Sequence, residues 1–188
     1  MKNLLKTLLS SIFVFMLFMF STIETLAQET PDTLTYKFEA INKHRQIYAS
    51  SCIPSCIEMV LKLNKKVDSN FYNYQKIWGN KIDGTFANFD GLLLNGLRFY
   101  QKFNILRNTN FPIEDLFMTI DKELLDGRYV IVSLPSDYGW HMYVICNKLP
   151  NGEFVAYSKN GGENMVETNV KKIIQRVKGT DIMIYREE

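Results

Sequence analysis

Two short segments of this 188-residue chain carry residue types that can perform chemistry together. In the first, Gln46 precedes Cys52, and Cys52 opens an apolar, helix-like run that continues to Leu63. In the second, His141 begins a β-like run. A thiol attacks only as its thiolate, which the unpaired N–H groups of a helix N-terminus favour, and a nearby imidazole can move the proton. The two segments therefore indicate a thiol hydrolase with Cys52 as nucleophile and His141 as acid/base.

Gln46 supplies an amide that could stabilise the oxyanion formed during attack on a carbonyl. The backbone N–H of Cys52 is a second candidate donor, and one such donor is worth about 3 kcal/mol. The substrate is expected to lie beside residues adjacent to these groups. Those candidates are Ile53, Tyr138, Gly139 and Trp140, although Tyr138 and Trp140 could equally pack within a hairpin.

The N-terminal residues have the composition of a signal peptide. Lys2 and Lys6 precede an apolar run over residues 8–20, and small residues before Gln28 suit a signal peptidase. We expect cleavage after Ala27, export to the periplasm or the extracellular space, and no stable membrane insertion after cleavage. An uncleaved anchor is the alternative. Residues 28–42 are then an extended lead-in, and residues 43–188 form one domain.

Composition excludes several other classes of protein. A net charge of +2 gives no case for binding nucleic acid or an anionic membrane surface. Three cysteines are too few for a disulfide scaffold. With two histidines and no paired cysteine motif a zinc site is not expected, and no cofactor is implied. The expected partner is a peptide or protein substrate.

Hydrophobic periodicity changes along the mature chain from helical to alternating, which favours an α+β fold. The expected helices cover residues 52–63, 71–78, 88–100, a segment from Pro112 to Gly127, and 169–177. The expected strands cover residues 129–134, 141–147, 153–158 and 181–185, with the second and third joined at Asn151-Gly152.

The Gln46 and Cys52 block resembles the papain-like double-glycine cysteine peptidases that trim bacteriocin leaders. In that family a Gln precedes a Cys-Gly, and the helix that follows ends in a Met-Val/Ile-Leu pattern like Met59-Val60-Leu61 here. The likeness covers about residues 38–185. Further matches are Gly139-Trp140-His141 before Tyr143-Val144-Ile145, Asp83-Gly84-Thr85, and Asn95-Gly96-Leu97. The resemblance implies a papain-like fold and a cysteine peptidase with Cys52, His141 and Gln46 in the roles given above.

Two positions depart from the family pattern. Ile53 stands where the family has Gly, and Ser158 stands where an Asp should orient the histidine. If Asn151-Gly152 is a two-residue loop, opposed residues have numbers that sum to 303, so His141 shares a face with Ser158 and Asn160. Either side chain is a candidate to orient His141, whereas Lys159 points away. A neutral partner predicts slow chemistry or none.

Structural interpretations of the same residues remain open. Cys52 could be a small core residue, as expected for Cys56 and Cys146, and these last two could also form a disulfide. His44 is predicted to lie on the surface. The alternatives for function are a cell-wall amidase of the same clan and a catalytically inactive papain-like domain that binds a peptide or partner.

Overall fold

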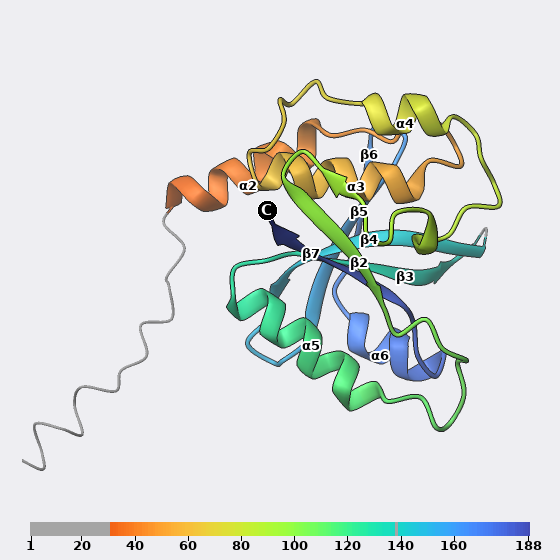
Figure 1. Ribbon diagram of the computed structural model, residues 1–188. Helices are drawn as coiled ribbons and strands as arrows, with labels where there is room; N and C mark the ends of the chain where they lie inside the picture. The colour runs from red at the N-terminus through yellow and green to blue at the C-terminus, as the bar shows by residue number, and fades with distance from the viewer. Residues whose placement is uncertain (1–30, 138) are drawn as a thin grey trace, which may run out of the picture. The chain divides into compact units, whose positions relative to one another are not determined.

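The computed structural model describes residues 31–137 and 139–188, and Figure 1 shows their arrangement. The predicted signal peptide and Tyr138 lie outside the described residues. In the described part of the chain no helix has the length and apolar character needed to cross a membrane.

A seven-stranded antiparallel sheet forms the centre of the domain, with strand order β1-β2-β7-β3-β4-β5-β6. Its strands are β1 Leu93–Leu94, β2 Leu97–Lys102, β3 Val130–Ser136, β4 Gly139–Lys148, β5 Phe154–Asn160, β6 Glu163–Glu167 and β7 Ile182–Glu187. The helices of the described residues are α2 Pro31–Lys43, α3 Cys52–Leu63, α4 Asn73–Trp78, α5 Ile113–Leu125 and α6 Val170–Arg176, with a 3₁₀ turn at Phe86–Asn88. The predicted α+β class is confirmed.

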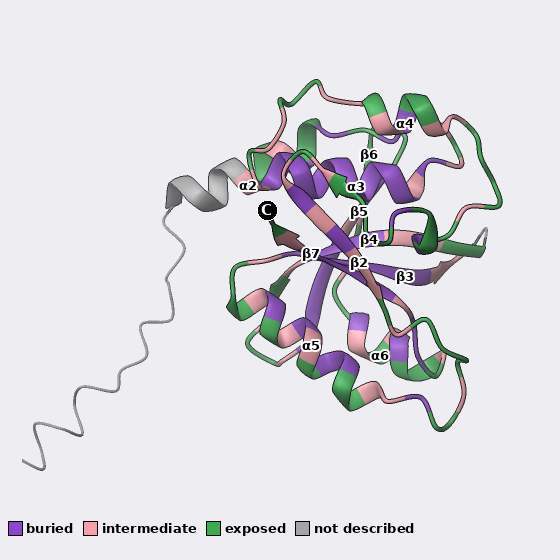
Figure 2. Ribbon diagram, viewed as in Figure 1, coloured by how far each residue is buried: buried purple, intermediate pink, exposed green. Residues whose placement is uncertain are grey.

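The sheet is covered on both faces (Figure 1), with α3 on one side and α5 and α6 on the other. Successive side chains of a strand point to opposite faces, so each central strand contributes to both cores. In β3, Ile131 packs in the core under α3, whereas Val130 and Val132 pack against α5 and α6. Figure 2 shows that α3 and the central strands are almost wholly buried.

Helix α3 begins and ends where the sequence predicted, at Cys52 and Leu63. Pro54 lies in its first turn, where a missing N–H costs nothing. Every residue of the helix after Cys52 is buried, so α3 is the central helix of the domain.

Two predicted segments are wrong. The helix expected at residues 88–100 is instead the hairpin of β1 and β2, because Asn95 and Gly96 both have positive φ (49° and 79°) and form a two-residue turn. The extended lead-in is helix α2 from Pro31 onward. Pro31 suits a first helical turn, Glu39 and Lys43 pair across one turn of helix, and Ile41 is buried.

The hairpin of β4 and β5 has a different register from the one predicted. Val144 pairs with Tyr157, and a bulge lies between Ile145 and Asn147. The loop is longer than two residues, since the Leu149 N–H donates to the Glu153 carbonyl. The shift near His141 amounts to two residues, so it preserves which face each side chain occupies.

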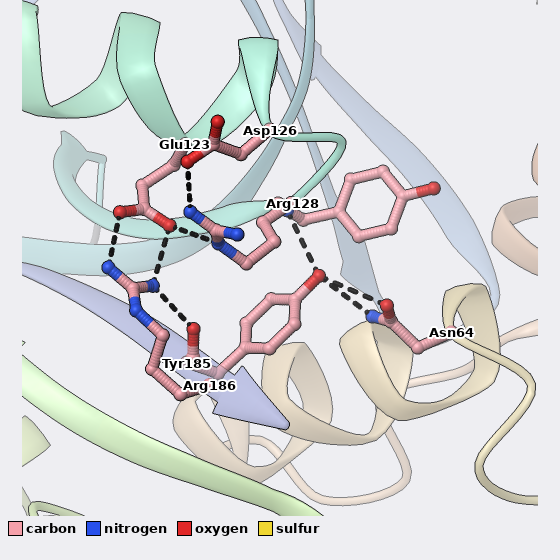
Figure 3. A network of polar contacts seen from close by, with 7 residues as sticks. Asn64, Glu123, Asp126, Arg128, Tyr185 and Arg186 are labelled. Atoms are coloured by element: carbon pink, nitrogen blue, oxygen red, sulfur yellow. Dashed lines mark hydrogen bonds and ion pairs between the residues drawn. The ribbon is translucent and has the colours of Figure 1, made fainter. Parts of the chain in front are cut away.

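A polar network joins the C-terminal end of α3 to the sheet (Figure 3). The Tyr185 hydroxyl exchanges hydrogen bonds with the Asn64 amide at 3.0 and 3.1 Å and accepts one from the Tyr129 N–H at 3.2 Å. Beside it, the Glu123 carboxylate accepts hydrogen bonds from Arg128 and Arg186. This network fixes the end of α3 that lies away from Cys52.

Candidate active site

One cleft of about 1050 Å³ brings most of the predicted site residues together. Helix α3 contributes Cys52, strand β4 contributes His141, and the loop before α3 contributes Gln46. The predicted substrate-binding residues Ile53 and Trp140, and Asn160 at the end of β5, also line this cleft. Gly139 starts β4 at the exposed turn opposite Ser136. The cleft therefore joins residues that lie about 90 positions apart in the sequence.

The N-terminus of α3 is not capped by its neighbouring serine. Ser51 is the N-cap residue, but in the described structure its side chain makes no capping hydrogen bond. Its hydroxyl instead lies 2.9 Å from the Tyr48 carbonyl and 2.8 Å from Gln75 Oε1. Capping by a side chain would satisfy a first-turn N–H group. Its absence leaves the N–H groups next to Cys52 available to a charge that develops at the sulfur or at a bound carbonyl.

Burial raises the pKa of the Cys52 thiol above its usual value. The backbone N–H groups of Ile53, Met142 and Cys52 act in the opposite direction, because they stabilise the thiolate. Met142 directly follows His141 on β4, so its effect also indicates that the sulfur lies against this strand. The resting thiol is protonated at neutral pH.

Ser158 is the residue that holds His141, as one of the two predicted alternatives. The His141 Nε2 atom lies 2.8 Å from Ser158 Oγ, and Ser158 Oγ lies 2.6 Å from the Met142 carbonyl oxygen. A carbonyl only accepts, so the single hydroxyl proton of Ser158 goes to Met142. His141 Nε2 must then carry a hydrogen and donate it to Ser158, which leaves Nδ1 with the lone pair. None of the described hydrogen bonds joins Asn160 to His141.

Burial lowers the pKa of His141, and the nearby Lys159 backbone, which favours the protonated ring, partly offsets the effect. The ring meets Tyr143 edge-on at 5.3 Å between centroids. Burial, with the carboxylates of Glu167 and Asp137, raises the pKa of Tyr143 to about 12. His141 is therefore an uncharged imidazole at neutral pH, beside a phenol that stays protonated.

Gln46 lies in the cleft, but its amide hydrogens are already used. Nε2 donates to the Tyr48 carbonyl at 3.0 Å and to the Ala49 carbonyl at 2.9 Å. An amide has two such hydrogens. The other atom of the amide, Oε1, is buried and has no hydrogen-bond partner among the described residues. Gln46 can serve an oxyanion only by withdrawing a hydrogen from Tyr48 or Ala49.

Two tryptophans shape the walls of the cleft, and only Trp140 was predicted there. The Arg107 guanidinium stacks on Trp140 at 3.8 Å and pairs with Asp181 at 3.1 Å, which fixes the indole beside His141. Trp78 also lines the cleft, and its Nε1 lies 3.0 Å from the Ser50 carbonyl. A Cβ at Gly84 would stand 2.0 Å from the Trp78 ring, so only glycine permits this chain to cross the indole.

The departure at Ile53 has little consequence for the cleft. Its side chain is only 3% exposed and belongs to the apolar core under α3. The disulfide left open between Cys56 and Cys146 is not formed within residues 31–137 and 139–188. Cys56 is buried, and its thiol lies 3.2 Å from the Met142 carbonyl that also accepts from Ser158.

Residues that the sequence did not single out anchor the loop before α3. His44, predicted at the surface, is fully buried, with Nε2 2.9 Å from the Ser55 carbonyl and Nδ1 3.0 Å from Lys62 Nζ. Burial and the Lys62 charge lower the pKa of His44 to about 3, and burial lowers that of Lys62 to about 8. Gln75 is also fully buried and bonds to the same loop. The polar positions at helical spacing on α3 were the available signal, because a polar stripe on a buried helix needs partners.

Among the described residues no group of three His, Cys, Asp or Glu side chains gathers as a metal site. No protein-family model matches the chain, and a search of curated proteins found none with a similar sequence.

Proposed function

We propose that this chain is an exported cysteine peptidase of papain-like fold that hydrolyses peptide bonds through Cys52 and His141. The observation that carries the proposal is the arrangement in the cleft. A thiol at an uncapped helix N-terminus shares the cleft with an imidazole whose Nε2 is engaged by Ser158. A buried cysteine and a core histidine have no structural need for this arrangement.

The reaction begins from an uncharged Cys52 thiol and an uncharged His141 imidazole. His141 Nδ1 takes the Cys52 proton as the sulfur attacks the substrate carbonyl, so the thiolate and the imidazolium form during attack. Ser158 accepts the Nε2 hydrogen throughout and keeps the ring in one tautomer. The imidazolium then returns its proton to the leaving amine, which releases the first product. Water, activated by the neutral imidazole, attacks the thioester and frees Cys52.

The oxyanion forms beside the N-terminus of α3. The backbone N–H groups of Cys52 and Ile53 are the donors that the uncapped first turn offers, and Pro54 has no N–H to add. Gln46 contributes a hydrogen by giving up one of its two bonds to the loop carbonyls. Its share is therefore smaller than that of an amide with an unused hydrogen.

A second function is favoured by the same electrostatics. Burial raises the pKa of Cys52 and lowers that of His141, and a hydroxyl stands where a carboxylate would stabilise an imidazolium. Each of these slows the chemistry, so a catalytically inactive domain that binds a peptide in the cleft is the alternative. A cell-wall amidase with the same Cys52 and His141 mechanism differs only in substrate.

Release of p-nitrophenolate from a p-nitrophenyl ester, followed by mass spectrometry of the acylated protein, tests the proposal. We expect an acyl group on Cys52, and its loss in Cys52→Ala and in His141→Ala. Cys56→Ala is the matched control and should keep the reaction, because Cys56 is buried one turn away. Acylation that survives Cys52→Ala would refute the mechanism, and no acylation at all would favour the binding domain. Peptide and peptidoglycan panels then separate peptidase from amidase.

A further inference from the structure

Gln75 holds the loop that carries Gln46 through a fully used side-chain amide. Gln75 lies on α4, three residues before the cleft residue Trp78, and is fully buried. Its Nε2 donates to the Arg45 carbonyl at 2.9 Å, and its Oε1 accepts from the Ile47 N–H at 2.8 Å. These two bonds clamp the backbone on either side of Gln46, in the way that a neighbouring β-strand would pair with it.

The same side-chain amide also contacts Ser51, just before α3, and Glu58, within α3. Oε1 also lies 2.8 Å from the hydroxyl of Ser51, the residue before Cys52. Nε2 also donates to Glu58 Oε2 at 2.7 Å, and Glu58 is a buried residue of α3 itself. An amide offers two hydrogens and two lone-pair directions, and Gln75 has a partner for all four, with the single Ser51 hydrogen shared between Gln75 Oε1 and the Tyr48 carbonyl.

Glu58 fixes Gln75 in return. Its Oε1 accepts from the backbone N–H groups of Tyr74 at 2.8 Å and Gln75 at 3.0 Å, so the first turn of α4 is anchored on the middle of α3. Burial raises the pKa of Glu58, and the bonds from Gln75 and Tyr74 oppose this. Helix α3 therefore sets the position of the loop before Cys52, because Glu58 of α3 holds Gln75 and Gln75 holds the loop.

We propose that Gln75 is a positioning residue for the oxyanion-binding part of the cleft, an inference that rests on the proposed function. It fixes the backbone around Gln46 and, together with the Tyr48 carbonyl, holds the Ser51 hydroxyl away from the first turn of α3. A redirected Ser51 leaves the N–H groups beside Cys52 uncapped. Loss of Gln75 should therefore impair attack on a carbonyl more than it impairs the reactivity of the thiol.

Two reactions of Cys52 in the full-length protein separate these effects. Acylation by p-nitrophenyl acetate passes through an oxyanion, whereas alkylation by iodoacetamide does not. Gln75→Glu keeps the shape but removes the Nε2 donor and sets a carboxylate against Glu58. We expect acylation at pH 8 to fall at least about tenfold relative to alkylation, with recovery toward lower pH as the new carboxyl gains a proton and can donate again.

Tyr185→Phe is the matched control. It removes the hydroxyl that bonds to Asn64 and Tyr129 at the other end of α3, so it costs stability without touching the loop. Its ratio of acylation to alkylation should equal that of the wild type. Gln75→Met, which removes all four bonds without adding charge, replaces Gln75→Glu should that variant not fold, and the same fall in the ratio is expected.

An unchanged ratio in the Gln75 variants, with the wild type acylated at Cys52, overturns this inference alone. The same is true if the ratio falls equally in Tyr185→Phe, since the effect then follows stability. A wild type that is alkylated but never acylated overturns the proposed function and this inference together.

Discussion

Ser158→Ala removes the group that fixes the tautomer of His141. The hydroxyl accepts from His141 Nε2 at 2.8 Å and donates to the Met142 carbonyl at 2.6 Å, and the side chain is only 2% exposed. Alanine therefore leaves the Nε2 hydrogen of His141 without its acceptor, while the Met142 carbonyl keeps the Cys56 thiol at 3.2 Å.

The expected cost follows from the unsatisfied donor. A buried donor that loses its partner costs about 1–3 kcal/mol, which corresponds to about 5–150-fold in rate if the loss falls on the reactive state. The Lys159 backbone, which raises the pKa of His141, remains in the variant. We therefore expect Cys52 acylation to fall about tenfold, near the lower end of that range.

The assay is the p-nitrophenolate burst, with two matched variants. Ser158→Thr keeps the hydroxyl on a β-strand and should retain most of the rate. Asn160→Ala alters the other predicted partner of His141, which is exposed, and should leave the rate unchanged. Nitrogen-15 chemical shifts of His141 should show hydrogen on Nε2 in the wild type and mixed tautomers in Ser158→Ala. A wild-type rate in Ser158→Ala, or an equal loss in Asn160→Ala, refutes the reasoning.

Three more predictions follow from the site and its frame. Burial raises the pKa of Cys52 and lowers that of His141, so the rate of alkylation by iodoacetamide should rise about tenfold per pH unit through the neutral range and to beyond about pH 9. The His141→Ala variant should show the same pH profile. A wild-type rate that is already constant below pH 7, and that loses this plateau in His141→Ala, would contradict the prediction. Gln46→Ala should lower the acylation burst by less than the roughly 100-fold lost with a dedicated oxyanion donor, because the amide hydrogens of Gln46 are already shared with loop carbonyls; a full 100-fold loss contradicts the observed bonding. Tyr185→Phe should lower the free energy of unfolding in urea by about 1–2 kcal/mol, since it leaves the amide of Asn64 without one partner, and an unchanged midpoint would count against that network.

The sequence predicted helix α3 well because its signals are local. Residues 52–63 have a proline in the first turn and a continuous apolar surface, and both act within one element. The hairpin of β1 and β2 failed for the opposite reason. Asn95-Gly96 fits a helix end as well as a two-residue turn, and the choice depends on pairing between β2 and β7, which lie far apart in sequence.

Ser158 was one of the two partners predicted for His141, although the assumed register was wrong. The longer loop and the bulge near Cys146 shift the strands by two residues from the assumed alignment. Side chains alternate with a period of two, so a shift of two leaves every residue on its face. A one-residue error would have put Lys159, which donates to the Asn42 carbonyl on the other face, in the place of Ser158.

The anchoring residues could not be found from sequence, because their types usually indicate exposure. His44 was predicted to lie on the surface, and Lys62 and Glu58 belong to charged types that are usually exposed. They are buried because each has a specific partner, and those partners lie on other elements. Only a count of unsatisfied polar groups on a helix already known to be buried could have suggested them.

A neutral side chain at position 158 is consistent with the low solvent exposure of that position. A carboxylate in place of Ser158 would stand at a position that is 2% exposed, next to the Met142 carbonyl, which can donate nothing to it. Its desolvation would be costly unless His141 were protonated permanently. With serine, the resting site holds an uncharged thiol and an uncharged imidazole, and in the mechanism that we propose charge appears only when a carbonyl is attacked beside the uncapped end of α3. Stabilisation of that charge then depends on the helix N-terminus more than on residue 158. Substitutions that displace the backbone N–H groups of Cys52 and Ile53 should therefore lower the rate of acylation most.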